Sequence, residues 1–463
     1  MRYLFGFLCV CALGIMPLVG CSETTGDGGG GGTAGTGGLA GSGGTGGVPQ
    51  CQSPEDCDDD NECTDDTCLA GVCEFMPVPD PTGPEEPGDP PGEGTTCGYY
   101  EGTCEGGSCV GTFACTEAGI REAIAAGAGP HTFACNGATT VVTQAPIEID
   151  NDVILDGAGE VTVDGNFDHH VFSVPVGVTA ELQGFTVTNG VDDPNISGAG
   201  GIRIDTNATV TLTDTTVSGN TGGWAGGITN NRGTLTLSSS TVSDNTGSGI
   251  VSTGPLTLTD STVSGNVSSN AASGGGIVAY DITLLVNSTI SGNSSSGGPG
   301  GAINTCKPMA GGCNPLTLIS STIAGNIGEP SIVTGDASMS VTNSLVDGDC
   351  DGDVTSNGYN IESPGNTCGF DQTGDQSGVT TEQLNLGELA ANGGPTMTHA
   401  LLTEPIVSVA VDVIPADDCV AADGGLLQDD QRGEPRFVFP SFGLAEPVGD
   451  GCDVGAFEVQ PEP

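Results

Sequence analysis

Basic residues are scarce in this sequence: seven of its 463 residues are Lys or Arg, against 59 Asp and Glu. The formal net charge of −52 repels nucleic acid and anionic lipid surfaces, which excludes binding to either through a basic patch. Helix-favouring composition is also missing, because Gly, Thr, Ser, Val, Asn and Asp dominate the chain. This mixture is typical of short strands joined by many turns, so the sequence indicates an all-β protein.

The apolar run at the N-terminus, residues 3–19, is too short for a membrane-spanning helix and is typical of a signal peptide. It ends in Leu-Val-Gly-Cys, which resembles the bacterial lipobox, where the Cys is lipidated and becomes the first mature residue. The resemblance implies a signal peptide over residues 1–20 and a lipid anchor on Cys21 that attaches the protein to a membrane. The alternative is an ordinary signal peptide that is cut after Gly20. Because Ser22 and not Asp follows the Cys, we expect an outer-membrane lipoprotein, surface-exposed or extracellular.

Residues 21–50 are rich in Gly, Ser and Thr and contain almost nothing that could bury a core. We expect a disordered tether that sets the reach of the protein from the membrane. Residues 51–110 then form a separate module that holds eight cysteines, enough to staple a segment too short for a large core. Its motif DCDDDNECTDDTCLAGVC resembles small disulfide repeats in surface proteins of myxobacteria, and the sequence leaves its connectivity open.

Three carboxylates in this module, Asp56, Asp58 and Asp60, stand at alternate positions before a possible turn. Such a spacing suits Ca²⁺, which binds several hard oxygen ligands. The loop departs from the EF-hand pattern, because Asn61 stands in place of the sixth-position Gly and Thr67 in place of the final Glu. Calcium is therefore the one candidate cofactor, and a solvated acidic loop is the alternative.

One stretch, residues 115–129, has a helical pattern. Thr116 can cap it, Ile120 and Ile124 share a face, and Gly127 ends it. It resembles the C-x-LREAI start of many secreted bacterial β-helix proteins, and we expect it to cover the open end of such a fold. The cysteines on either side of the helix, Cys115 and Cys135, are expected to pair.

The centre of the chain contains five copies of one sequence repeat, of which TVTLTDTTVSGN is the first, and each copy ends on an Asn. These residues are Asn220, Asn245, Asn266, Asn293 and Asn326. Their separations of 25, 21, 27 and 33 residues are typical of a solenoid. Leu or Val stands at alternate positions in three copies, and one aliphatic residue precedes the Asn in all five. Because no helix-length segment separates the strands, the sequence predicts a parallel β-helix with three short sheets over residues 111–345. We expect the five asparagines to stack as an amide ladder.

The repeats resemble those of chlamydial polymorphic outer-membrane proteins and of other pectin-lyase-like right-handed β-helices. In that family an aromatic residue commonly precedes the Asn, whereas this chain has Val or Ile there. The resemblance implies a right-handed solenoid of the pectin-lyase-like class. A second cysteine pair, Cys306 and Cys313, brackets an insertion in the last repeats and is expected to staple a surface loop.

Some β-helices degrade polysaccharides, and such enzymes need paired carboxylates or carboxylates beside a basic group. Arg203 and Asp205 are the best candidates, because strand alternation places both side chains on the outer face. Asp244 and Asp260 lie in turn-like contexts, where Asp usually bonds the local backbone. The adjacent histidines 169 and 170 are expected to lie at the surface rather than bind metal.

Residues 346–463 change character and carry the motifs NGYNIESPGNTCGF, DQRGEPR and CDVGAFE. Their order resembles the choice-of-anchor Q domain, which ends many secreted β-helix proteins and implies surface display. Two disulfides are expected in this module, Cys350 with Cys368 and Cys419 with Cys452. We expect the module to cap the last coil of the β-helix.

The module also contains polar residues that could be mistaken for a catalytic site: His399, Asp430, Arg432, Asp453 and Glu458. The favoured interpretation is structural, with Arg432 paired to a carboxylate such as Asp453 or Glu458. The sequence therefore predicts a non-enzymatic surface lipoprotein that displays a β-helix for adhesion, or for interaction with carbohydrate or protein of the cell envelope. A polysaccharide lyase or glycoside hydrolase is one alternative, and a Ca²⁺-dependent surface binding protein is the other.

Overall fold

The structure is a computed structural model of the chain. It describes residues 108–192, 198–269, 274–296, 298–305, 314–436 and 451–460, together with four short strands that precede residue 108. Those strands are β1 (Thr64–Leu69), β2 (Val72–Pro77), β3 (Thr96–Cys97) and β4 (Gly102–Glu105). β1 and β2 form an antiparallel pair, and β3, β4 and β5 (Ser108–Val110) form a small antiparallel sheet.

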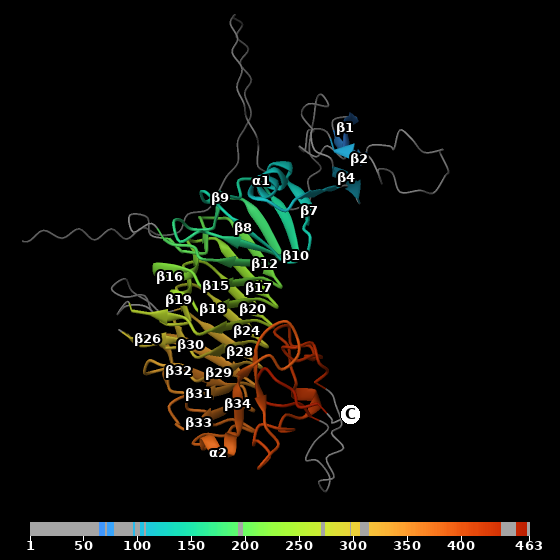
Figure 1. The fold of residues 1–463 in the computed structure, drawn as a ribbon. Coiled ribbons are helices and arrows are strands. Elements are labelled where there is room, and N and C mark those ends of the chain that lie inside the picture. The colour runs from blue at the N-terminus through green and yellow to red at the C-terminus, as the bar shows by residue number, and fades with distance from the viewer. Residues whose placement is uncertain are drawn as a thin grey trace, which may run out of the picture. The chain divides into compact units, whose positions relative to one another are not determined.

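Helix α1 (Glu117–Ala126) covers the N-terminal end of the solenoid, as the sequence predicts (Figure 1). The hydroxyl of Thr116 accepts a hydrogen bond from the backbone N–H of Gly119, which satisfies one of the free donors of the first turn. Ile120 and Ile124 are buried against the first coils and belong to the main core. No helix in the described part of the chain is long and apolar enough to span a membrane.

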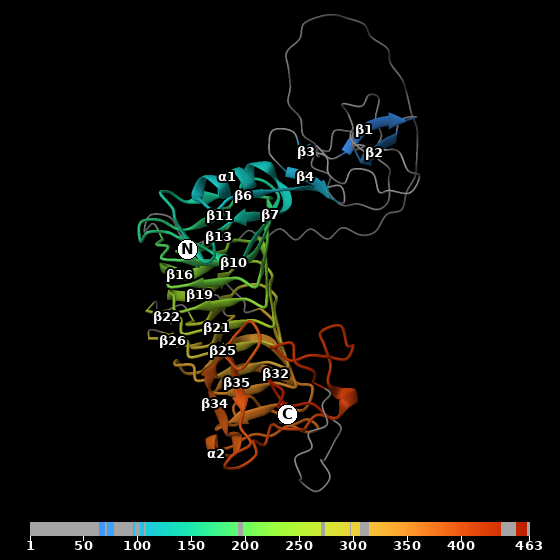
Figure 2. The ribbon, with the colours of Figure 1, turned by 45° about the vertical axis from the view of Figure 1, so that its right-hand side comes forward.

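The strands from β6 (Thr112–Ala114) to β33 (Ile361–Ser363) form one continuous parallel sheet, which winds through three columns (Figures 1 and 2). The first column contains β7 (Ala128–Ala134), β10 (Val153–Asp164), β12 (Thr179–Thr188), β14 (Thr209–Thr213), β17 (Thr234–Ser238), β20 (Leu256–Thr259), β24 (Thr283–Val286), β28 (Leu316–Ile319), β30 (Ile332–Thr342) and β32 (Cys350–Ser356). The second contains β8 (Thr139–Val142), the later halves of β10 and β12, β15 (Thr216–Ser218), β18 (Thr241–Ser243), β21 (Thr262–Ser264), β25 (Thr289–Ser291), β29 (Thr322–Ala324), β31 (Leu345–Asp347) and β33 (Ile361–Ser363).

The third column contains β9 (Ile147–Glu148), β11 (Phe172–Val174), β13 (Ile202–Ile204), β16 (Thr221–Asn230), β19 (Thr246–Ser252), β23 (Ile277–Ala279), β27 (Ile303–Asn304) and the first part of β30. Two shorter strands, β22 (Val267–Ser268) and β26 (Ser294–Ser295), follow the Asn turns, and β6 (Thr112–Ala114) pairs with β7 before the first coil. Each column is parallel throughout, so the chain forms a parallel β-helix.

The interior of the β-helix is apolar because every strand turns alternate residues inward. Leu212 pairs in register with Leu237, and Val217 with Val242, and all four side chains are fully buried. Full burial of such a side chain stabilises the fold by roughly 1.5–3 kcal/mol. Because like residues stack from coil to coil, the repeat seen in the sequence becomes one continuous core.

The coils continue past residue 345, since β32 and β33 add a further turn of the β-helix that ends at Ser363. The disulfide between Cys350 and Cys368 and the ring of Phe370 then join the same core. Residues just after the coils thus close this end of the interior, while most of the C-terminal module lies elsewhere.

The rest of the module comprises residues 380–436 and 451–460. Most of it lies along the side of the later coils, while its short helix, Thr381–Leu384, lies at the end of the β-helix (Figures 1 and 2). We call this part of the module the C-terminal segment; it contains α2 (Thr381–Leu384), the antiparallel strands β34 (Leu386–Ala390) and β35 (Thr398–Leu401), and a short 3₁₀ helix (Ala416–Asp418). Its hydrogen bonds reach turns from Asp260 to Asn343. Cys368 and Phe370 thus pack on the last coil, whereas most of the C-terminal segment lies against a lateral face.

Candidate functional site

The five asparagines predicted to stack form a continuous ladder. The side-chain N–H of Asn220 donates to Oδ1 of Asn245 at 3.1 Å, and the next three steps measure 2.8, 2.9 and 3.0 Å. The Oδ1 of each later Asn also accepts from the backbone N–H of the preceding Asn, as Asn266 does from Asn245, and the Oδ1 of Asn220 accepts from the backbone N–H of Gly190. The ladder is almost entirely buried and its donors and acceptors are paired, so it builds the turn and is not free to bind a ligand.

A second ladder lies five residues before the first, at the turn between the first and second columns. It contains Thr215, Ser240, Ser261, Ser288, Ser321 and Ser344. Each hydroxyl accepts a hydrogen bond from the backbone N–H of the residue above it in the ladder, as Ser261 does from Ser240 at 3.1 Å. This ladder is not among the features predicted from the sequence, although a Ser or Thr stands five residues before every repeat Asn.

A third feature, which we call the threonine column, lies on the outside of the second strand column. Strand register places eight threonines one above another, from β8 to β29. They are Thr140, Thr162, Thr186, Thr216, Thr241, Thr262, Thr289 and Thr322. The first five are exposed or half-buried, whereas the last three are buried by the C-terminal segment.

The covered end of the threonine column bonds the C-terminal segment at every coil. Thr262 donates to the backbone carbonyl of Met397 at 2.6 Å, and Thr289 donates to Oε1 of Gln431 at 2.6 Å. Thr322 accepts from the backbone N–H of Ala456 at 3.0 Å. Each hydroxyl therefore serves as donor or acceptor according to the group that faces it.

His399 adds a contact beside this column. Its Nδ1 lies 2.7 Å from the carbonyl of Gly387 and its Nε2 lies 2.7 Å from Oγ of Ser291. Because a carbonyl can only accept, Nδ1 carries the proton and the Ser291 hydroxyl donates to Nε2 of the neutral ring. Burial lowers the pKa of His399, which favours this neutral form. The pair is enclosed between the segment and the coils, with Ser291 3% exposed, so it fastens the segment.

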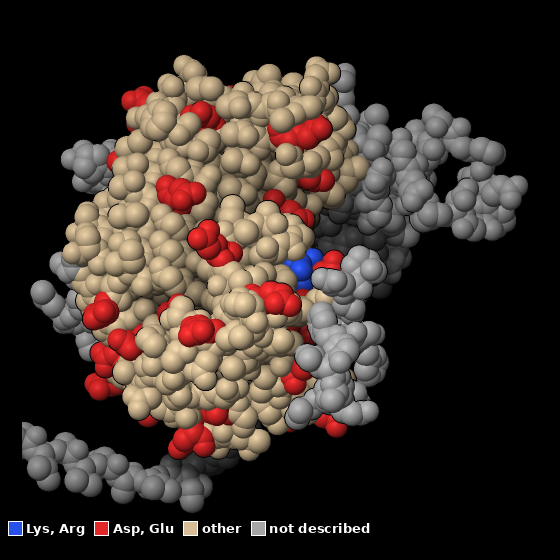
Figure 3. Space-filling view, turned by 60° about the horizontal axis from the view of Figure 1, so that its bottom comes forward, with Lys and Arg blue, Asp and Glu red and all other residues tan. Residues whose placement is uncertain are grey.

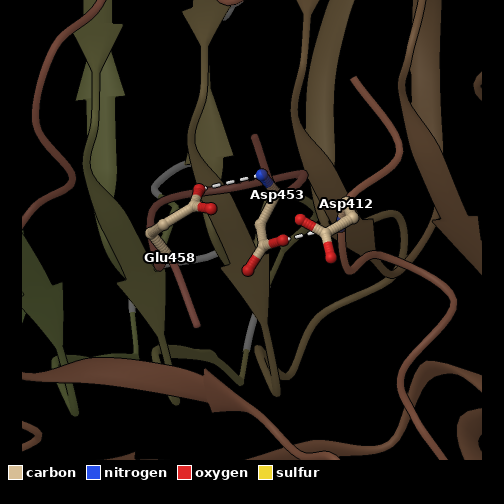
Figure 4. A group of neighbouring side chains, drawn as sticks. All are labelled: Asp412, Asp453 and Glu458. Atoms are coloured by element: carbon tan, nitrogen blue, oxygen red, sulfur yellow. Dashed lines mark hydrogen bonds between the residues drawn. The ribbon is translucent and has the colours of Figure 1, made fainter. Parts of the chain in front are cut away.

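A carboxylate cluster lies in the later part of the C-terminal segment, between residues 412 and 458. Oxygen atoms of Asp412, Asp453 and Glu458 all lie within 4.8 Å of one another (Figure 4). Asp453 accepts from the backbone N–H groups of Asp412 and Val459, each at 2.7 Å, and Glu458 accepts from that of Asp453 at 2.8 Å. The guanidinium of Arg436, fully buried, lies 3.6 Å from Glu458.

Burial controls the protonation of this cluster, since an isolated charge is costly in a dry site. It raises the pKa of Asp453 to about 7, and burial together with the Asp453 carboxylate raises the pKa of Glu458 to about 10. The attraction of Arg436 opposes both shifts without reversing them. Three carboxylates could in principle hold a cation. Here backbone N–H groups already bond Asp453 and Glu458, and Arg436 lies beside Glu458, so these two carboxylates act as an internal anchor.

Arg432 differs from the predicted pairing with Asp453 or Glu458. Its side chain forms an ion pair with Asp430 at 2.7 Å and packs 3.7 Å from the ring centre of Phe457. Its only bond to Glu458 is to the backbone carbonyl. The tight turn of the DQRG motif brings positions 430 and 432 together, and Arg436 takes the place beside Glu458.

Three comparisons bear on this geometry. Residues 151–307 match the protein family described as "Right handed beta helix region". The fold is a right-handed parallel β-helix. A crystal structure of pectate lyase Pel9A is also similar, at 13% identity and a TM-score of 0.44, over 76% of this chain and 96% of that one. None of the curated proteins compared with the chain matches it.

The polar residues predicted on the right-handed β-helix itself are dispersed. Arg203 and Asp205 lie on the outer face and pair with each other at 3.2 Å, each partly exposed. Asp260 accepts from Asn287 at 3.0 Å, and burial raises its pKa to about 6. The ring of His169 contacts backbone carbonyls. These groups are not brought together at one site.

Three of the predicted disulfides are present in the described residues: Cys115–Cys135, Cys350–Cys368 and Cys419–Cys452. Other predicted residues lie outside the described part of the chain: Cys21, Asp56, Asp58, Asp60, Cys306 and Cys313. The lipid anchor and the calcium site thus stay predictions. At the C-terminal end of the right-handed β-helix, acidic side chains are spread over the surface and basic ones show at one place (Figure 3).

Proposed function

We propose that the protein is a lipid-anchored protein of the bacterial outer surface whose β-helix binds carbohydrate of the cell envelope, or of a neighbouring surface, without cleaving it. The lipobox that ends in Cys21 and the Gly-rich tether support the anchoring and display. The resemblance of residues 346–463 to the choice-of-anchor Q domain supports surface display as well.

The observation that carries the proposal is the occupied end of the threonine column. There the β-helix already serves as a binding surface, because Thr262, Thr289 and Thr322 each bond the C-terminal segment through their hydroxyls. Hydroxyls in regular rows suit a partner that is itself rich in hydroxyls, and carbohydrate is the surface polymer with that chemistry. The clustered carboxylates Asp453 and Glu458 are buried and bond backbone N–H groups, which supports binding over hydrolysis.

A glycan array probed with the purified full chain, followed by an assay for released reducing sugar, tests the proposal. We expect binding of at least one surface glycan and no release of sugar from it. Release of sugar would replace the proposal by the polysaccharide-degrading alternative. Binding that requires Ca²⁺, and that is lost when Asp56, Asp58 and Asp60 are changed to Asn, would favour the calcium-dependent alternative. An array with no bound glycan would refute the carbohydrate partner.

A further inference from the structure

We propose that the open end of the threonine column binds a neutral, unbranched polysaccharide that runs along the axis of the β-helix. The open end contains Thr140, Thr162, Thr186, Thr216 and Thr241. This inference rests on the proposed carbohydrate-binding function and adds the site, the direction of the ligand and its charge. Four observations carry it: continuity with the occupied end, the coil repeat, the absence of basic groups and an exposed aromatic ring.

The open and occupied ends are one continuous surface. Thr241 pairs in register with Thr262, and the two differ only in what lies over them. Among the described residues, the hydroxyls of Thr186, Thr216 and Thr241 have no hydrogen-bond partner, whereas their counterparts below bond the C-terminal segment. The open end therefore presents the same bonding groups at the same spacing, and no described part of the C-terminal segment bonds to it.

The repeat of the column favours a polysaccharide over a polypeptide. Neighbouring strands lie ~4.8 Å apart, so the five open rungs span roughly 19 Å. An extended polypeptide along this axis would present groups on one side only every ~6.8 Å, and it would lose register within two coils. A pyranose ring with its linkage oxygen is close in length to one coil, so successive sugars can place a hydroxyl opposite each Thr.

The charge of the strip favours a neutral ligand. A second outward row runs beside the threonine column at its open end: Val142, Asp164, Thr188, Ser218 and Ser243. Neither row contains Lys or Arg, and the whole chain has a formal charge of −52. An anionic polymer such as a polyuronate would be repelled, whereas neutral sugars bond hydroxyls without a charge cost.

An exposed aromatic ring lies beside the open end. Phe167 is 70% exposed, and its backbone N–H donates to the carbonyl of Asn189, the residue after Thr188. Val142, in the outward row, is also exposed, at 46%. Sugar rings have an apolar C–H face that packs on such surfaces, so this edge can hold one end of the chain while the hydroxyls bond the rest.

The test compares two triple variants of the full chain by calorimetric titration. The first, Thr186→Val, Thr216→Val and Thr241→Val, removes three open hydroxyls while it keeps the branched shape that strands favour. The control, Thr211→Val, Thr236→Val and Thr257→Val, changes a register-matched row of half-buried threonines on the first column. The probes are cellohexaose, laminarihexaose and maltohexaose, with hexagalacturonate as the anionic comparison.

We expect one neutral hexasaccharide to bind, with affinity reduced about tenfold or more in the first variant and unchanged in the control. A Thr→Ser version of the first variant should keep the affinity, which separates loss of hydroxyls from misfolding. Equal binding by both Val variants would overturn the site and leave the proposed function standing. Preference for hexagalacturonate would overturn the neutral ligand. A full chain that binds no glycan on the array would remove the proposed function and this inference with it.

Discussion

The guanidinium of Arg436 lies 2.6 Å from Oδ1 of Asn287, and this bond joins the C-terminal segment to a turn of the β-helix 149 residues earlier. The same side chain donates to the backbone carbonyls of Gly455 and Asp453. One buried cation therefore connects three stretches of chain that are remote in the sequence.

Replacing Arg436 with Met should detach the C-terminal segment or destabilise it strongly. The change removes bonds to Asn287, Gly455 and Asp453 and leaves their buried acceptors unpaired, which costs about 3–5 kcal/mol. Urea unfolding and limited proteolysis of residues 380–460 measure the effect. Arg232→Met, at an exposed turn, is the matched control and should change stability by less than about 0.5 kcal/mol. Equal stability of the two variants would show that Arg436 is not an anchor.

Asn266→Ala should destabilise the centre of the amide ladder. The substitution leaves the backbone and side-chain N–H groups of Asn245 without their acceptor, and the carbonyl of Val242 without its donor. We expect a loss of roughly 2–4 kcal/mol, because buried unpaired groups are costly. Thermal unfolding followed by circular dichroism measures it, with Thr236→Val on the outer face as the near-neutral comparison. A wild-type melting curve for Asn266→Ala would contradict the structural role of the ladder.

The stability of the docked C-terminal segment should fall as the pH rises. Burial raises the pKa of Asp453 to about 7 and that of Asp260 to about 6, above the value near 4 expected for the unfolded chain. The folded state therefore binds more protons between those values, and its free energy of unfolding decreases with rising pH, by at most roughly 1.4 kcal/mol per pH unit for each proton. The raised pKa of Glu458 extends the same decrease in stability to higher pH.

Urea unfolding at intervals from pH 4.5 to 8 measures this slope. Asp453→Asn should reduce the slope between pH 5 and 7, because one of the titrating groups is removed while Asp260 and Glu458 remain. Asp205→Asn, which removes one negative charge on an outer face remote from the C-terminal segment, is the matched control. Stability that rises with pH over this range would contradict the assigned direction.

The disulfide between Cys419 and Cys452 should contribute more than its position near the end of the chain implies. It closes a loop with a sequence separation of 33, which corresponds to roughly 3–4 kcal/mol in the chain-entropy model. The double variant Cys419→Ala, Cys452→Ala should lower the urea midpoint of the C-terminal segment accordingly. The urea midpoint of the β-helix, followed by the fluorescence of Trp224, should stay unchanged. A loss of the same size in both midpoints would indicate that the segment and the β-helix unfold as one cooperative unit.

The sequence predicts the right-handed β-helix because its signals are local and repeated. Inward residues such as Val217 and Leu212 recur at one spacing, and so do the ladder asparagines. The second ladder, of Ser and Thr hydroxyls, has an equally regular spacing in the sequence. Ser is common in turns for other reasons, however, so the position of a residue such as Ser261 does not by itself predict a ladder. Repetition thus identifies a role only when the residue type is unusual for its place.

The candidate site was less predictable, for a physical reason. The contacts between the C-terminal segment and the coils join residues up to 170 positions apart, as Gln431 and Ser261 do. Nothing in a single irregular segment specifies which lateral face it covers. Arg436 ends the DQRGEPR motif, but only the fold shows that it, rather than Arg432, lies beside Glu458.

The threonine column has a consequence for how such a protein can evolve. Each coil contacts only its neighbours, so duplication of one coil within the gene would add a rung to the ladders, the core and the column together. The open end of the threonine column would then lengthen by one threonine for each added coil, while the C-terminal segment would still cover three threonines. Related chains could therefore differ in reach, and in the length of polymer they hold, through coil number alone.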